Sequence, residues 1–211
     1  MIYYLLAIAI FIIIILIPVV MVWGLIYAYK KLSRKYFLIL IAIIVGSPYI
    51  TFKWFERNFM LEVVPDALEV NSVTYNKEES WGFGPGGNEA GIRIYLLPEK
   101  ISSTIKKQGI EFFHNMPQNR SQDSRRWRGL YSNWKETPIK PGKDWVENKE
   151  SGQLNIYDYI CRYGFCIDIE PTIVKEANYI INTPGSFYAY GRIGLIVVSP
   201  ERNLVMYLYN G

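Results

Sequence analysis

Two long apolar segments near the N-terminus constrain the fold of this chain more than any other feature. Residues 2–29 contain no charged side chain, and the segment 36–55 contains only Lys53. An α-helix needs about 20 apolar residues to cross the hydrocarbon core of a bilayer. We therefore expect two transmembrane helices, over about residues 3–29 and 36–55. A secretory signal peptide would begin with basic residues and carry a shorter apolar segment, so we do not expect cleavage after the first segment.

A short basic segment, residues 30–35, separates the two apolar segments. Its basic residues are Lys30, Lys31, Arg34 and Lys35. Short loops rich in lysine and arginine stay in the cytoplasm during membrane insertion. The sequence therefore predicts a transmembrane helical hairpin over residues 1–55, embedded in the lipid bilayer, with both chain ends outside. On this prediction the protein is a multi-pass protein of a bacterial-type inner membrane, and residues 56–211 form one domain on the periplasmic or extracellular side.

The net charge of +4 arises entirely from the apolar N-terminal region. Five of the 23 basic residues precede residue 56, whereas all 19 acidic residues follow residue 55, which leaves 18 basic side chains in the domain. The predicted domain is therefore close to neutral. Nucleic-acid-binding domains carry a basic patch and a high net positive charge, so we expect no nucleic-acid partner.

The chain contains two cysteines, Cys161 and Cys166, in a segment rich in β-forming residues. We expect a β-hairpin over residues 154–170 that turns at Tyr163 and Gly164 and places the two sulfur atoms on paired strands. A disulfide there is typical of an oxidising compartment. Two buried free thiols are the second interpretation. A metal site ranks third, because no second Cys or His pair accompanies the cysteines, and we expect no metal or cofactor.

The other patterns in residues 56–211 predict an α+β domain with a mainly antiparallel sheet and about two helices. One helix is expected to begin at Pro98 and the other at Pro171, since proline suits the first turn of a helix. Gly109 is expected to weaken or bend the first helix. The second helix carries apolar residues at helical spacing. The expected strands cover residues 67–75, 91–97, 154–161, 165–170, 192–198 and 204–209, and the last two form a terminal hairpin.

The sequence contains no recognisable catalytic constellation. The single histidine, His114, lies at the end of a predicted helix, where a surface or capping role is expected. Asp158, Asp168 and Glu170 lie on the predicted hairpin. Paired carboxylates at a suitable separation carry out glycoside hydrolysis, but acidic residues are also common on hairpins. We therefore expect no catalytic residue and no enzymatic activity.

A glycine-rich segment, residues 82–87, formally matches the pattern G-x-G-x-x-G. A dinucleotide site needs a helix directly after these glycines, whose N-terminus meets the pyrophosphate. Here a predicted strand follows instead. We interpret the segment first as a structural loop between strands. A partner-binding loop, with Trp81 and Phe83 as a candidate recognition tip, is the second interpretation.

A second candidate interaction segment combines arginine and tryptophan. Its residues are Arg120, Arg125, Arg126, Trp127 and Arg128. Arginine and tryptophan are the residue types that dominate binding energy at protein interfaces, and the planar guanidinium binds carboxylates and phosphates in a bidentate manner. A solvated basic loop without a partner is the alternative. The sequence therefore predicts either a binding segment or a solvated basic loop here.

Together these features favour a protein-interaction module held at the outer face of the inner membrane. An immunity or exclusion factor acting against a toxin or phage, or an accessory factor of an envelope complex, would have this organisation. Its expected partner is another envelope protein or an incoming toxin or phage component. A membrane-tethered sensor or effector that binds a small ligand is the alternative, and an envelope hydrolase acting through the carboxylates ranks third.

Overall fold

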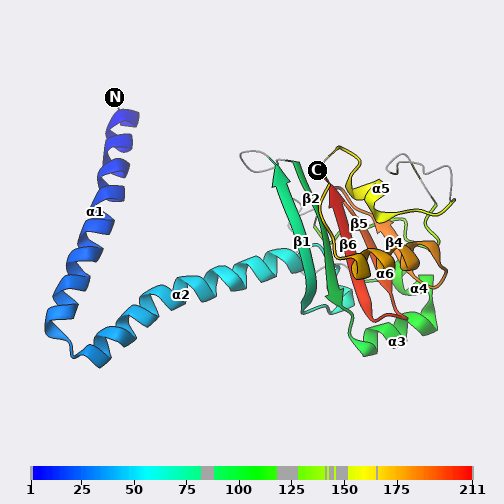
Figure 1. The fold of residues 1–211 in the computed structure, drawn as a ribbon, viewed down its shortest axis with the longest axis horizontal. Coiled ribbons are helices and arrows are strands. Elements are labelled where there is room, and N and C mark those ends of the chain that lie inside the picture. Colours follow the sequence, from blue (N-terminus) through cyan, green and yellow to red (C-terminus); the bar gives the residue numbers. More distant parts are fainter. Residues whose placement is uncertain are drawn as a thin grey trace. The chain divides into compact units, whose positions relative to one another are not determined.

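The computed structural model describes residues 2–81, 88–117, 128–140, 142, 145, 152–164 and 166–210. The chain divides into two compact units, residues 1–56 and residues 57–211. The first unit is helical, and the second contains a sheet and shorter helices (Figure 1).

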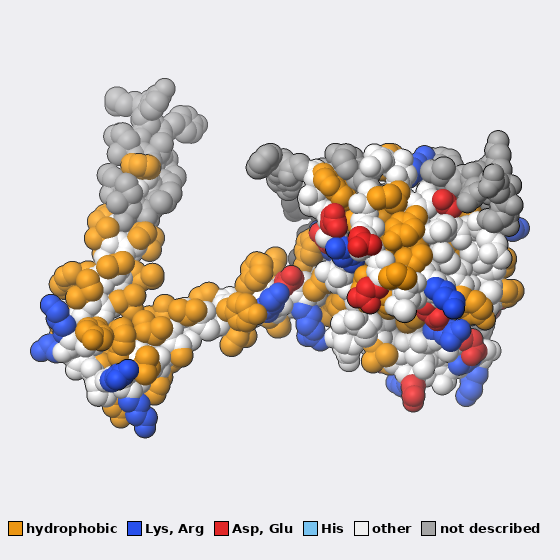
Figure 2. Space-filling view, viewed as in Figure 1, with side chains coloured by type: hydrophobic (Ala, Val, Ile, Leu, Met, Phe, Trp, Pro, Cys, Tyr) orange, Lys and Arg blue, Asp and Glu red, His pale blue; other side chains and the backbone are white. Residues whose placement is uncertain are grey.

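Two long helices, α1 (Ile2–Lys31) and α2 (Arg34–Leu61), account for most of the first unit, and the last five residues of α2 belong to the second. Basic side chains gather at the turn between them, as Figure 2 shows, and Lys30 and Lys31 form the last turn of α1. The turn therefore lies where the sequence predicts the basic loop. α2 continues past residue 55, the end of the second predicted span.

α2 is long and apolar enough to cross a membrane, and it is the one helix for which this holds among the described residues. None of its residues is buried within the protein, and hydrophobic side chains dominate its surface in Figure 2. A core helix of a soluble domain would bury such a surface, because apolar area exposed to water is unfavourable. The length and composition of α2 suit a membrane anchor or a signal sequence.

A six-stranded antiparallel sheet forms the centre of the second unit (Figure 1). Its strands are β1 (Val73–Trp81), β2 (Asn88–Leu96), β3 (Lys135–Glu136), β4 (Phe187–Tyr190), β5 (Leu195–Ser199) and β6 (Leu204–Asn210). The strands lie in the order β1-β2-β6-β5-β4-β3. All five pairings are antiparallel, which confirms the predicted α+β class with its antiparallel sheet.

The sheet has a hydrophobic core on each face. Along β6, Met206 and Leu208 enter one core while Val205 and Tyr207 enter the other, as the two-residue period of a strand requires. Helices α5 (Ile156–Ile160) and α6 (Pro171–Asn182) pack in the first core, and α6 lies across the sheet in Figure 1. Helices α3 (Glu99–Gln108) and α4 (Ile110–His114) pack in the second. The described part of this unit therefore has four α-helices, where the sequence predicts about two.

Several predicted elements are confirmed. The terminal hairpin is β5 and β6, which pair from Leu195–Leu208 to Ser199–Leu204. α6 begins at Pro171 as predicted. The helix predicted from Pro98 begins one residue later and is interrupted at Gly109, whose φ of 61° favours glycine and separates α3 from α4.

The hairpin predicted over residues 154–170 is wrong. Residues 156–160 form α5, and residues 166–170 form no strand. A capping box begins α5: the backbone N–H of Asn155 donates to the Asp158 carboxylate at 3.0 Å, and the N–H of Tyr157 donates to the Asn155 side chain at 3.1 Å. These bonds satisfy N–H groups that the first turn of a helix leaves free. Asp158 therefore has a structural role here.

The predicted disulfide between Cys161 and Cys166 is present, although in a different setting. Cys161 caps the C-terminus of α5, and the bond closes the loop that follows this helix instead of joining two strands. The Cα atoms of the two cysteines are 4.6 Å apart, within the usual range for a disulfide. Such a bond persists in an oxidising compartment.

Two further strand predictions need correction. The strand predicted over residues 67–75 begins only at Val73, because Asp66–Leu68 form a 3₁₀-helix and Glu69 adopts a left-handed conformation. β4 is absent from the sequence prediction, although its residues are almost entirely buried.

Candidate functional site

Most residues of the two predicted interaction segments lie outside the described part of the chain. These residues are Phe83, Arg120, Arg125, Arg126 and Trp127. Trp81 is described: it ends β1, is half-buried, and packs against the core on the α6 side of the sheet. A part of the Trp81 side chain therefore stabilises the domain itself.

Arg128 makes two contacts within the domain. Its Nη1 donates to the Glu62 carboxylate at 3.0 Å, and its guanidinium lies over the Phe59 ring, 3.9 Å from the ring centre. Both contacts join Arg128 to the segment that ends α2. Reversing the charge at Arg128 would break these contacts as well as change the basic segment, so binding tests on Arg125 and Arg126 are easier to interpret.

Two of the residues weighed for catalysis contact residues close to them in the sequence. His114 is exposed and lies 3.7 Å from Glu111 on its own helix, and Asp158 accepts the capping hydrogen bond at α5. No group of three or more His, Cys, Asp or Glu side chains suited to a metal ion occurs among the described residues.

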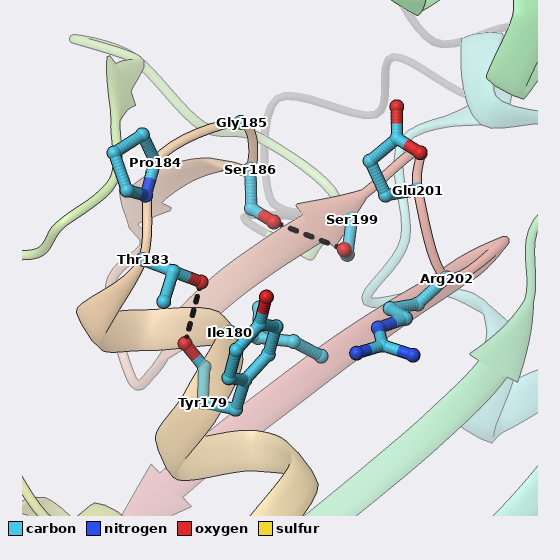
Figure 3. A pocket seen from close by; sticks show the side chains of 9 residues that line it. All are labelled: Tyr179, Ile180, Thr183, Pro184, Gly185, Ser186, Ser199, Glu201 and Arg202. Carbon is cyan, nitrogen blue, oxygen red and sulfur yellow. Dashed lines mark hydrogen bonds between the residues drawn. The ribbon is translucent and has the colours of Figure 1, made fainter.

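An open pocket lies where the C-terminal end of α6 meets the turn between β5 and β6 (Figure 3). We call it the hydroxyl pocket. It has a volume of about 290 Å³, and its lining includes Tyr179, Thr183, Ser186, Ser199, Glu201 and Arg202. α6 supplies the tyrosine, the loop after α6 supplies Thr183 and Ser186, and the end of β5 with its turn supplies the other three.

Local sequence features shape this pocket. Pro184 and Gly185 end α6, and the φ of 97° at Gly185 is a conformation that favours glycine. Thr137 then fixes the loop, because its hydroxyl donates to the Thr183 carbonyl at 2.6 Å and accepts from the Ser186 N–H at 3.1 Å. The Ser186 side chain is thereby held against the end of β5.

The floor of the pocket is a pair of buried hydroxyls. The Ser186 hydroxyl donates to the Ser199 hydroxyl at 2.9 Å, and the two side chains belong to residues that are 5% and 2% exposed. Figure 3 shows this bond at the centre of the view. Two hydroxyls carry two hydrogens, and their mutual bond uses one. No described residue accepts the other, so it is available to a molecule in the pocket.

Arg202 and Tyr179 form one side of the pocket. The Nε of Arg202 lies 3.0 Å from the Glu176 carboxylate, and its guanidinium lies 5.1 Å from the centre of the Tyr179 ring. These contacts hold the arginine by one edge. The two terminal nitrogens of its guanidinium have no partner among the described residues, and in Figure 3 the guanidinium points to the same hollow as the Tyr179 ring.

A second hollow of about 440 Å³ lies on the other side of Tyr179, which lines both, together with Thr183. Its amide side chains support the fold: Asn178 accepts from the Ile156 N–H at 2.8 Å, and Asn182 bonds both backbone groups of Leu154. Tyr179 is 53% exposed and stands as a ridge between the two hollows. We call the side chains along this ridge the Tyr179 surface; they are the exposed Lys175, Tyr179, Glu201 and Arg202 and the half-buried Thr183.

A separate polar cluster lies on the opposite face of the sheet. Arg93 is 6% exposed and pairs with the Glu78 carboxylate at 2.5 Å. The Tyr209 hydroxyl also donates to Glu78, and its ring lies under the Arg93 guanidinium, 4.9 Å from the charge centre. Burial raises the pKa of the neighbouring Tyr207 phenol to about 12, although the positive charges of Arg93 and Arg128 lower this pKa. Burial also raises the pKa of Tyr209.

These raised pKa values predict that the domain loses stability in alkali. A tyrosine whose pKa rises on folding stabilises the fold fully below about pH 10, and this contribution is lost as the pH rises towards the folded pKa. For Tyr207 the loss amounts to about 2 kcal/mol at pH 12 and approaches about 3 kcal/mol only above that pH. We expect the urea midpoint of the full chain in detergent micelles to fall from pH 9.5 to 11.5, and Tyr207→Phe to reduce the slope. Tyr163→Phe, at an exposed position, is the control, and a pH-independent midpoint would contradict the prediction.

Sequence reasoning missed the hydroxyl pocket although it predicted the elements on both sides of it. The apolar stripe of α6 leaves Tyr179 on the polar side of the helix, and an aromatic residue there is the signal that the sequence offered. Arg202 lies in the predicted turn between β5 and β6. Nothing in the sequence indicates that Ser186 and Ser199 meet, because their contact depends on the pairing of β4 with β5.

Comparison with known proteins gives no relative: no protein family, curated protein or solved structure matches the chain.

Proposed function

We propose that α1 and α2 anchor the protein in a bacterial-type inner membrane as a two-helix hairpin, with the second unit on the periplasmic or extracellular side. The apolar surface of α2, the uncharged sequence of α1 and the basic turn between them support this arrangement. The disulfide between Cys161 and Cys166 supports an oxidising compartment for the second unit.

The last residues of α2 are part of the folded second unit. There the Tyr95 hydroxyl donates to the Met60 carbonyl at 2.8 Å and Arg57 donates to the Asn71 carbonyl. Tyr95 is fully buried. Cleavage of the chain after Met60 would leave this buried hydroxyl without its acceptor, at a cost of about 1–3 kcal/mol.

For the domain we propose a role in protein interaction, through the Tyr179 surface. The observation that carries this proposal is an exposed tyrosine between two hollows with an arginine held beside it. Tyrosine and arginine are enriched among the residues that dominate binding energy at interfaces. The hydroxyl pocket, at about 290 Å³, lies at the lower end of the size range of small-molecule sites. Small-molecule sites are mostly apolar, whereas hydroxyl, carboxylate and guanidinium groups line this pocket.

An anchored interaction domain at this location fits an immunity or exclusion factor that meets an incoming toxin or phage component, or an accessory factor of an envelope complex. In both roles the anchor confines the domain to the surface where its partner arrives. The arginine and tryptophan segment predicted from the sequence stays a separate prediction, with Arg125 and Arg126 as the residues to test.

Photo-crosslinking in intact cells of the source organism tests this proposal. A photoreactive amino acid placed at position 179 is expected to give one discrete adduct, and competition by Tyr179→Ala protein is expected to be at least about tenfold weaker than by the native protein. Tyr163 is the matched control, because it is a tyrosine of similar exposure (61% against 53% for Tyr179) outside the Tyr179 surface. The same adducts from positions 163 and 179, or none from position 179 under toxin or phage challenge, would contradict the proposal.

A further inference from the structure

We propose that the hydroxyl pocket binds a carboxylate, supplied by an acidic side chain of the partner protein. This inference rests on the proposed function, because it names the chemistry of the partner at the same surface. It follows from the hydrogen-bonding groups that the pocket leaves unused, from the state of the nearby acidic groups and from the open mouth of the hollow.

The unused groups are donors. Three kinds of donor have no acceptor among the described residues. They are the terminal nitrogens of Arg202, the spare hydrogen of the Ser186 and Ser199 pair, and the Tyr179 hydroxyl. A ligand that satisfies all of them must be rich in acceptors. A carboxylate has two oxygens and about four lone-pair sites, and it accepts the two parallel N–H bonds of a guanidinium.

Arg202 is positioned for this task by two contacts. The Glu176 carboxylate holds its Nε at 3.0 Å, and the Tyr179 ring lies beside its guanidinium. Both side chains of the Arg202–Glu176 pair are more than a third exposed, so the pair orients the guanidinium and adds little stability of its own. Lysine at this position would keep the charge but lose the planar fork.

The negative groups near the pocket are largely occupied. Glu201 lies at the rim and pairs with Lys106 at 3.3 Å. The C-terminal end of a helix carries partial negative charge on its free carbonyls, but here the Tyr179 carbonyl accepts from the Thr183 hydroxyl at 2.7 Å and the Ile181 carbonyl accepts from the Ile139 N–H at 2.9 Å. The repulsion that an incoming carboxylate meets is thereby reduced.

The open mouth of the pocket suits a side chain that projects from the surface of a partner protein. Its volume of about 290 Å³ includes an open mouth between α6 and the turn. A side chain projecting from a protein surface enters such a mouth while the rest of the partner contacts Tyr179. An aspartate or glutamate side chain therefore satisfies the donors and leaves the exposed tyrosine to pack against the partner surface.

Short peptides test the chemistry without knowledge of the partner. The full chain is placed in nanodiscs with ¹⁵N-labelled glycine and serine, and the amide signals of Gly185, Ser186 and Ser199 are followed by NMR. Acetyl-Gly-Glu-Gly-amide is expected to shift them saturably with a Kd on the order of millimolar. The neutral peptide acetyl-Gly-Gln-Gly-amide is expected to bind at least about tenfold more weakly, since it lacks the charge-assisted hydrogen bonds.

Substitutions then assign the effect to the pocket. Arg202→Lys and Arg202→Gln are each expected to weaken binding of the glutamate peptide at least about fivefold. The control is Arg192→Gln, in the turn between β4 and β5, which is expected to leave binding unchanged. Equal binding of the two peptides, or no effect of the Arg202 variants, would overturn the inference. If acetyl-Gly-Gln-Gly with a free C-terminal carboxylate bound more tightly than acetyl-Gly-Glu-Gly-amide, the assignment to an acidic side chain would be overturned.

The peptide results and the crosslinking results separate the two proposals. A partner captured at position 179 with no peptide preference for glutamate leaves the proposed function in place and removes the carboxylate inference. Glutamate binding without any partner at position 179 contradicts the proposed function and with it the assignment of the carboxylate to a protein.

Discussion

Replacing Gly194 by alanine is expected to lower the free energy of unfolding of the domain by about 3 kcal/mol. Gly194 lies directly before β5, where a Cβ atom would be 2.6 Å from the Leu208 carbonyl oxygen and 2.6 Å from the ring of Tyr207. Real Cβ atoms do not approach other atoms so closely, so either β5 moves away from β6 or the tyrosine moves. Both changes disturb a buried region.

The position of Tyr207 makes the second adjustment costly. Its hydroxyl donates to the Ile193 carbonyl at 3.3 Å, and its ring stacks on Tyr209 with 5.2 Å between ring centres. Urea unfolding of the full chain in detergent micelles, followed by near-ultraviolet circular dichroism, measures the effect. Gly142→Ala is the control, because a Cβ there meets no atom within 4 Å. Equal stability of the Gly194 and Gly142 variants would contradict the prediction, because it would show that the space beside Gly194 accommodates a Cβ atom.

Replacing Glu78 by alanine is expected to destabilise the domain by a similar amount, about 3 kcal/mol. Glu78 supplies the carboxylate that pairs with buried Arg93 and accepts from the Tyr209 hydroxyl. Without it the arginine keeps its charge in a largely buried site, with the Asn76 side chain as a weaker acceptor at 3.3 Å. An uncompensated buried charge is the main cause of the expected loss.

A neighbouring pair on the same strand provides the control for Glu78. Glu79 contacts Lys77 at 3.3 Å, and both side chains are more than a third exposed, so Glu79→Ala is expected to cost less than about 1 kcal/mol. The double variant Arg93→Met with Glu78→Leu is expected to recover a large part of the lost stability, because it removes the charge together with its partner. A Glu78→Ala variant as stable as Glu79→Ala would mean that Arg93 is well solvated.

Elements with a strong periodic pattern and clear end signals could be predicted from the sequence. α6 begins at Pro171 and ends before Pro184 and Gly185, and the terminal hairpin alternates around a turn that contains Pro200. In both cases local preference and burial agree. Gly109 likewise indicated the interruption between α3 and α4, because glycine is a poor helix former and readily adopts positive φ.

The segment around α5 could not be predicted by strand propensity, because tertiary packing decided its conformation. Its isoleucines and tyrosines favour strands, yet Ile156, Tyr159 and Ile160 bury one helical face in the core. Asn155 followed three residues later by Asp158 resembles a capping box and was the local signal for a helix. The hydroxyl pocket was beyond sequence reasoning for a different reason: its residues meet only because α6 packs beside the turn between β5 and β6.

The proposed topology is tested most directly by measuring on which side of the membrane the second unit lies. Intact spheroplasts are treated with protease, and the mobility of the chain on non-reducing gels reports the state of Cys161 and Cys166. We expect digestion of residues 57–211 from outside, a protected fragment close to residues 1–56, and an oxidised cysteine pair. Protection of the whole chain, with both thiols free, would place the domain in the cytoplasm and contradict the proposed anchor topology.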